Sequence, residues 1–281
     1  MKKSLFEKTV ILLIGIALFS GLQLKLDELK LKTVPKEPIY LPSGKYLRAI
    51  ALGNDTLMAD ILYLWSIQHY SIYTIKEHRF RYLEHVYNMI TDLDPHYLDP
   101  YLIGALIMAK EGGFYQMAFR LLEKGMKNNP DAWILPVDAG FYAFQDLKDY
   151  ELALYYFKKA AEIKGSPPFI KRLIAGIYER KNENQTALAF WTEIYRTAKE
   201  DWVKTIAYNH IYDLKIKIDL EQLRVAIELF KDQKKRLPRS LRELIKAGFL
   251  YQLPKDPEGN NYLYNPRTGE VKSRTPFRLK R

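Results

Sequence analysis

The sequence predicts an all-α protein: a helix-turn-helix solenoid with an N-terminal membrane helix and a small C-terminal helix plus β-hairpin module. The main observation is a repeat in which small or apolar residues stand 35, 35 and 34 positions apart, and a large apolar side chain follows each of them four positions later. The repeated residues are Leu83, Ala118, Ala153 and Ala187, followed by Tyr87, Leu122, Phe157 and Trp191. A period of about 34 residues is typical of stacked helical pairs, because each pair buries its apolar face against the next.

Composition and charge exclude several kinds of site. The 281 residues include no cysteine, which excludes a disulfide scaffold, a thiolate metal site and a cysteine nucleophile. Residues 1–36 carry seven lysines against three acidic residues, and residues 220–281 carry fifteen basic against seven acidic residues. The region between them is nearly neutral. This distribution argues against a nucleic acid bound along the repeats, and it allows the basic ends to contact anionic lipid.

The N-terminal region has the composition of a signal-anchor. Residues 1–8 form a basic tail, and residues 9–26 contain an uncharged run from Thr9 to Leu24. A helix of this length reaches roughly 24 Å, and flanking lysines can extend toward the membrane surface, so one crossing of a ~30 Å hydrocarbon core is feasible. No small-residue cleavage site follows. We therefore expect an uncleaved transmembrane anchor, with a cleaved secretory signal and a buried soluble helix as the alternatives.

The orientation of this anchor is not decided by charge, because lysines lie on both sides of the apolar run. A short N-terminal tail usually stays in the cytoplasm. We therefore expect a single-pass protein of the bacterial inner membrane with most of its chain in the periplasm. Residues 27–56 contain several prolines and glycines and are predicted to form a linker.

Helical periodicity begins at residue 57. A long first helix has Leu57, Ile61 and Leu64 on the stripe that we expect to face the core. Asp219 and Gln222 stand at capping-box spacing and predict the start of the last helix. The further helices are expected over residues 79–92, 98–111, 114–128, 132–146, 149–163, 169–181, 184–198, 201–216 and 220–236.

The repeat resembles the tetratricopeptide repeat family over about residues 57–236. The residues that fall at the positions of that family are Tyr115, Ala118, Leu122, Gly125, Pro130, Tyr150, Ala153, Phe157, Ala160, Ala175, Tyr178, Ala187 and Trp191. A small residue in the second helix lets the first helix approach closely, and the large residue one turn later fills the gap between pairs. The tryptophan and glycine that the family usually has early in the first helix are missing here.

The resemblance implies a curved array whose first helices line a concave groove. The family positions carried onto this chain are Ile103, Ile107, Lys110, Asp138, Tyr142, Gln145, Arg172, Gly176 and Glu179. This lining is mixed in character and would suit a protein or peptide segment as partner. The alternative is that much of this face packs against the C-terminal region of the chain itself.

Residues 237–281 are predicted to form a basic C-terminal module, with a short helix that starts at Ser240 and a hairpin around Tyr262–Tyr264 and residues 270–273. Its turn is similar to the C-terminal segment of type II secretion major pseudopilins. The likeness is carried by Leu253, Pro254, Asp256, Pro257, Gly259, Asn260, Tyr262 and Tyr264. In that family the loop can hold calcium, but here Asp256, Glu258 and Asn260 offer few oxygen ligands.

No catalytic or metal-binding pattern is present. The five histidines lack a zinc spacing, and neither a phosphate-binding loop nor a nucleophile elbow occurs. We therefore expect a non-enzymatic scaffold without cofactor that binds a protein partner, such as a component of pilus or secretion assembly. The alternatives are a subunit of an envelope polymer-synthesis enzyme, with chemistry at Asp256, Glu258, Tyr262 and Tyr264, and a cytoplasm-facing adaptor of opposite topology.

Overall fold

The computed structural model describes residues 18–22, 24–25, 42–77 and 80–279. Most of the predicted anchor and the first part of the predicted linker lie outside these residues. Within the part of the chain that is described, no helix combines the length and apolar character needed to cross a bilayer.

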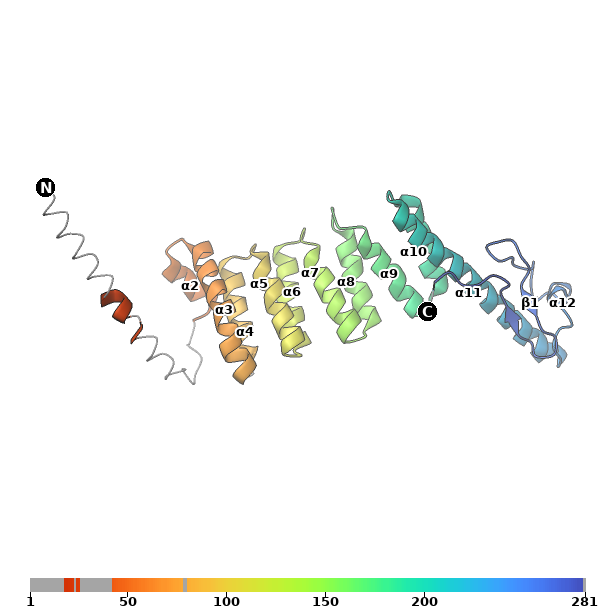
Figure 1. The fold of residues 1–281 in the computed structure, drawn as a ribbon, viewed down its shortest axis with the longest axis horizontal. Coiled ribbons are helices and arrows are strands. Elements are labelled where there is room, and N and C mark those ends of the chain that lie inside the picture. Colours follow the sequence, from red (N-terminus) through yellow and green to blue (C-terminus); the bar gives the residue numbers. More distant parts are fainter. Residues whose placement is uncertain (1–17, 23, 26–41, 78–79, 280–281) are drawn as a thin grey trace.

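The described residues are mostly helical, which confirms the predicted all-α class, and Figure 1 shows the helices side by side in one elongated row. The helices of the row are α2 (Gly44–Ala51), α3 (Asp55–Glu77), α4 (Phe80–Leu93), α5 (Leu98–Leu106), α6 (Tyr115–Asn128), α7 (Ile134–Phe141), α8 (Tyr150–Glu162), α9 (Phe169–Arg180), α10 (Asn184–Thr197) and α11 (Asp201–Lys234). Two π-helical turns, η1 (Ile107–Glu111) and η2 (Tyr142–Asp146), continue α5 and α7.

The C-terminal module follows α11 at one end of the row. It consists of α12 (Leu241–Lys246) and a two-stranded antiparallel hairpin, β1 (Leu263–Tyr264) and β2 (Val271–Lys272), in which Leu263 faces Lys272. Gly248 follows α12 with φ of +78°, a backbone conformation that glycine adopts without strain and that commonly ends a helix. The predicted short helix and hairpin are therefore present.

Alternate helices form two layers. The second helices of successive pairs are joined by contacts between residues that stand about one repeat apart in the sequence. Arg120 on α6 binds Glu84 on α4 at 2.7 Å, and Tyr156 on α8 donates to Glu123 on α6 at 2.8 Å. The first helices are joined in the same way: Lys110 in η1 binds Asp146 in η2 at 2.6 Å, and the guanidinium of Arg172 on α9 lies 5.1 Å from the Trp202 ring on α11.

The residues of the sequence repeat lie in the core between the layers. Leu83, Ala118, Leu122, Ala153, Phe157, Ala187 and Trp191 are all buried in one apolar cluster. Gly140 on α7 shows how close the helices come, because a β-carbon at this position would lie 2.6 Å from the Phe157 ring. A side chain larger than hydrogen would therefore push α7 away from α8.

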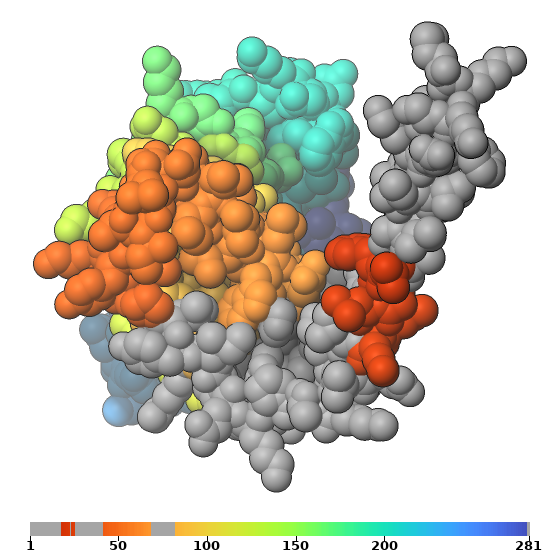
Figure 2. Space-filling view, turned by 90° about the vertical axis from the view of Figure 1, so that its left-hand side faces the viewer, coloured from red at the N-terminus to blue at the C-terminus, as the bar shows by residue number. Residues whose placement is uncertain are grey.

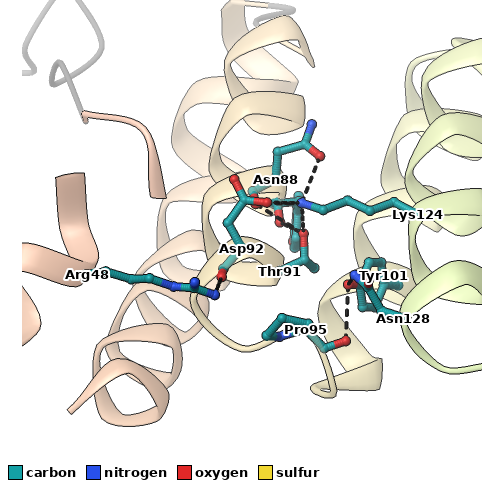
Figure 3. Close-up of polar contacts among 9 residues, drawn as sticks. Arg48, Asn88, Thr91, Asp92, Pro95, Tyr101, Lys124 and Asn128 are labelled. Atoms are coloured by element: carbon teal, nitrogen blue, oxygen red, sulfur yellow. Dashed lines mark hydrogen bonds and ion pairs between the residues drawn. The ribbon is translucent and has the colours of Figure 1, made fainter. Parts of the chain in front are cut away.

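A polar cluster joins α2, α4 and α6 near the N-terminal end of the row (Figure 3). The ammonium group of Lys124 on α6 contacts α4 through Thr91 Oγ1 at 2.7 Å, Asp92 Oδ1 at 2.6 Å and the Asn88 carbonyl at 2.9 Å. Arg48 on α2 donates to the Asp92 carbonyl oxygen from the other side. Two of these bonds use backbone carbonyl groups, those of Asn88 and Asp92, near the C-terminal end of α4, where the helix dipole favours cations.

Three predictions about the helices are wrong. Residues Gly44–Ala51 were expected in a linker but form α2, which buries Leu47 and Ala51. On α3, Leu57, Ile61 and Leu64 are exposed, and among residues 55–68 the buried ones are Ala59, Leu62, Tyr63 and Ser66. The helix is apolar on both faces, so periodicity alone did not distinguish the inner one.

The predicted pair at 201–216 and 220–236 is a single helix, α11. Asp219 does not cap a helix. Its carboxylate is buried and accepts hydrogen bonds from Lys215 at 2.6 Å and from the Tyr262 hydroxyl at 2.8 Å. The first half of α11 belongs to the main core, and its second half packs with Leu241, Leu244, Tyr262 and Val271 in a second core under the C-terminal module.

The packing predicts opposite effects of the same substitution at two glycines. Gly140→Ala should lower the free energy of unfolding by about 1–3 kcal/mol, because its methyl group would overlap Phe157. Gly176→Ala on α9 should raise it by about 0.5–1 kcal/mol, because a β-carbon there meets nothing within 4 Å and alanine favours the helix. Urea unfolding followed by circular dichroism measures both, and equal effects of the two substitutions would contradict this packing.

Candidate partner-binding face

The outer surface of the first helices carries the residues that the sequence places in a groove. We call it the first-helix face. It is defined by half-buried or exposed residues on α5–η1, α7–η2 and α9, namely Ile103, Leu106, Lys110, Asp138, Phe141, Gln145, Arg172, Gly176 and Glu179. The ion pair of Lys110 with Asp146 and the stacking of Arg172 on Trp202 tie the successive helices together along this face.

Two predicted groove residues do not lie on the face. Ile107 and Tyr142 are only 7% and 4% exposed and belong to the core. Each is the first residue of a π-helical turn, which holds more residues per turn than an α-helix and changes the direction of the side chains around it. Leu106, one position before Ile107, is 43% exposed, whereas Phe141, one position before Tyr142, is half-buried and packs its ring edge-on against Phe157 with centroids 5.3 Å apart. On α9, which has no π turn, Gly176 stays on the face as expected.

Asp138 is the distinctive polar group of the face. The residue is half-buried, and the resulting desolvation raises the pKa of its carboxyl from the usual 3.8 to about 6. None of the hydrogen bonds or ion pairs found among the described residues involves its carboxylate. Neighbouring carboxylates differ in this respect, because Asp146 binds Lys110. An unpaired carboxylate at this depth costs free energy that a hydrogen-bond donor from outside would recover.

At the C-terminal end of the first-helix face, α11 contacts α9 at Glu179. Glu179 accepts a hydrogen bond from the Trp191 indole nitrogen at 2.6 Å, and Nδ1 of His210 lies 2.6 Å from the same oxygen. The His210 ring stacks on Trp191 with centroids 3.9 Å apart. Burial alone would raise the pKa of Glu179, but the hydrogen bonds from His210 and Trp191 outweigh it and hold the pKa below its usual value. Glu179 is thus an internal contact, and the open part of the face runs from Ile103 to Arg172.

The four residues of the C-terminal module that the sequence offers as possible catalytic groups all make hydrogen bonds within the chain. The buried Asp256 carboxylate accepts from the backbone N–H groups of Glu258 and Asn260 and from the Thr275 hydroxyl. Glu258 accepts from the Tyr212 hydroxyl at 2.8 Å. Tyr262 and Tyr264 donate to Asp219 and to the Pro238 carbonyl. Within the described ranges, no group of three His, Asp or Glu side chains is placed to hold a metal ion.

No protein-family model matches this sequence, and no curated protein matches it either. The tetratricopeptide and pseudopilin resemblances therefore depend only on the residues that carry them. What these resemblances imply about function remains a proposal.

The burial of Asp138 predicts a pH-dependent stability. Because its pKa is higher in the folded chain, the folded state binds more protons between about pH 4 and 6, so stability falls as pH rises through this window. Asp138→Asn should raise the free energy of unfolding at pH 7 by about 1–2 kcal/mol, less than two full pKa units imply because the carboxylate is part exposed. Below about pH 4 the gain should disappear.

Urea unfolding at pH 4, 5, 6 and 7 tests this expectation. The control is Asp131→Asn, at an exposed position in the turn before α7, which should follow wild type at every pH. A gain for Asp138→Asn that does not change with pH would show that the carboxylate is not the cause.

Proposed function

We propose that this protein is a membrane-anchored scaffold in which a tetratricopeptide-like solenoid binds a segment of a partner protein along the first-helix face. The observation that carries this proposal is Asp138, a partly buried carboxylate without a partner among the described residues. It lies between Ile103 and Arg172 in the order of the array. Apolar neighbours such as Leu106 and Phe141 add contact area beside it.

The chemistry of the face selects the kind of segment that it binds. A main-chain N–H, a lysine or an arginine of the partner would donate to Asp138, and a charge-assisted bond of this kind is stronger than a neutral one. The apolar side chains Ile103, Leu106 and Phe141 would contact aliphatic or aromatic side chains of the segment. The face therefore suits an apolar segment with a donor or a basic residue.

The anchoring part of the proposal rests on the uncharged run in residues 9–26 and on the exposed end of the row. Leu57, Ile61 and Leu64 of α3 are each more than half exposed, and Figure 2 looks onto this end, with the first part of α3 facing the viewer. An apolar stripe of this kind usually contacts another apolar surface. We propose that this end of the row lies next to the bacterial inner membrane, with the helices in the periplasm.

Photo-crosslinking in cells tests the binding face. A benzoylphenylalanine in place of Gln145, which is exposed on η2, should capture a partner protein. The same group in place of Tyr155, which is 56% exposed on α8 in the other layer, should not. Asp138→Asn in the Gln145 background should reduce capture by about 10-fold through the loss of one charge-assisted hydrogen bond.

The asparagine variant separates loss of the carboxylate from loss of folding, because it is expected to be at least as stable as wild type at pH 7. A loss of capture would then reflect the lost carboxylate and not unfolding. Capture of the same proteins from Gln145 and Tyr155, or capture that is unaffected by Asp138→Asn, would contradict the proposal.

The absence of cysteine allows a direct test of topology. Tyr251, 96% exposed in the C-terminal module, can be replaced by cysteine to give one reactive thiol in the chain. A maleimide that cannot cross the inner membrane should label Tyr251→Cys in cells whose outer membrane is permeabilised. The cysteine-free chain is the control. Labelling only after lysis of the cells would place the chain in the cytoplasm and support the adaptor of opposite topology.

A further inference from the structure

The C-terminal module contains a hollow that the first-helix face does not explain. It has a volume of about 320 Å³ and lies between α12, the Leu253–Pro254 segment and the hairpin, against one side of α11. This module lies at the end of the row opposite α2 (Figure 1). The hollow combines an apolar floor with a cationic rim.

The floor is formed by Leu253, Pro254, Pro266 and the rings of Tyr262 and Tyr264, with the fully buried Leu223 of α11 beneath them. The two tyrosine hydroxyls are used below the floor, where Tyr262 donates to Asp219 and Tyr264 donates to the Pro238 carbonyl, each at 2.8 Å. Their hydroxyls are therefore engaged in holding the module on α11. What remains for a ligand is ring and aliphatic surface, which favours an apolar side chain.

The rim is formed by Arg239, Ser240, Arg242 and Asn261, all of them exposed. No hydrogen bond or ion pair of these four side chains is found within the described part of the chain. Their neighbour Arg236 differs, because it binds Glu243 at 2.6 Å. Glu243 also accepts from the backbone N–H of Arg239 at 2.6 Å. The nearby acidic group is thus already neutralised, and the guanidinium groups of Arg239 and Arg242 remain available.

Additional positive charge lies beside the hollow. Lys255 pairs through its backbone with Asn261, which brings its chain segment to the same rim. A neighbouring hollow of about 580 Å³ shares Leu253 and Pro254 with the first and includes Lys255 in its lining. The apolar surface and the excess of cations therefore continue from one hollow to the next.

We propose that this hollow binds an acidic segment of a partner protein. A carboxylate of the segment would lie between Arg239 and Arg242, whose planar guanidinium groups match the two oxygens of a carboxylate. Ser240 and Asn261 would complete its hydrogen bonds, and an adjacent apolar side chain would rest on Tyr262 and Tyr264. A protein segment is favoured over an anionic lipid, because the apolar floor is sized for single side chains and the hollow lies at the end of the row opposite α2, the end that we propose lies next to the membrane.

Fluorescence anisotropy with the full-length chain in detergent tests this proposal. The probe is a fluorescein-labelled twelve-residue peptide of alternating Glu and Leu, and the matched probe has Gln in place of Glu. The Glu peptide should bind at least about 10-fold more tightly than the Gln peptide. Arg239→Gln with Arg242→Gln should weaken binding of the Glu peptide by about 10-fold or more.

The control removes two positive charges from the same module but not from the hollow. Lys246→Gln with Arg267→Gln alters exposed residues that do not line it and should change binding by less than about 3-fold. Equal losses in the two double variants would show unspecific attraction to a basic surface and overturn the proposal. Absence of binding of the Glu peptide would overturn it as well.

Vesicles of phosphatidylglycerol and phosphatidylcholine separate a lipid from a protein segment. Vesicle binding that depends on Arg239 and Arg242, combined with weak binding of the Glu peptide, would assign the hollow to a lipid headgroup and overturn the proposal. The test is independent of the first-helix face, because Asp138→Asn should leave binding of the Glu peptide unchanged. Failure at one site therefore does not decide the other.

Discussion

The close approach of neighbouring helices over very small side chains is the constraint on which the rest of the structure depends. Ala118, Ala153 and Ala187 are completely buried, and Gly140 leaves room only for the Phe157 ring. Because neighbouring helices pack on one another through such contacts, ion pairs such as Arg120 with Glu84 can recur at nearly the repeat spacing. The polar links follow from the apolar packing, since surface ion pairs alone contribute little stability.

Much of the helical arrangement was predictable, because its signals are local. The period of about 34 residues, prolines such as Pro130 and the capping residue Asp149 mark where helices end and begin, and Asp149 accepts from the Leu152 N–H as a cap should. The break predicted near Asp219 was wrong. The spacing of Asp219 and Gln222 is a local signal for a helix start, and it carries no information about the contacts that Asp219 makes with distant parts of the chain. Within the continuous helix the Asp219 carboxylate accepts from Lys215, one turn earlier, and from Tyr262, which is 43 residues away in the chain.

The candidate sites were predictable only in part. Family positions placed Asp138 on the first-helix face, but its burial and its lack of a partner appear only when α5 and α7 are packed together. The buried Ile107 and Tyr142 are the first residues of π-helical turns, which break the regular 3.6-residue period on which the sequence assignment depended. The arginine hollow could not be foreseen, because Arg239 and Arg242 meet Pro254 and Asn261 only after the hairpin folds onto α11.

The continuous helix α11 belongs to both apolar cores, from Val203 and Ala207 in the first to Ile227 and Phe230 in the second. A 34-residue α-helix is about 50 Å long and resists bending when both of its halves are packed. The module cannot swing freely on a hinge, because no unpacked link separates it from the array. The packed helix would therefore set both the distance and the angle between the first-helix face and the hollow beside α12, the two surfaces that we propose bind partners.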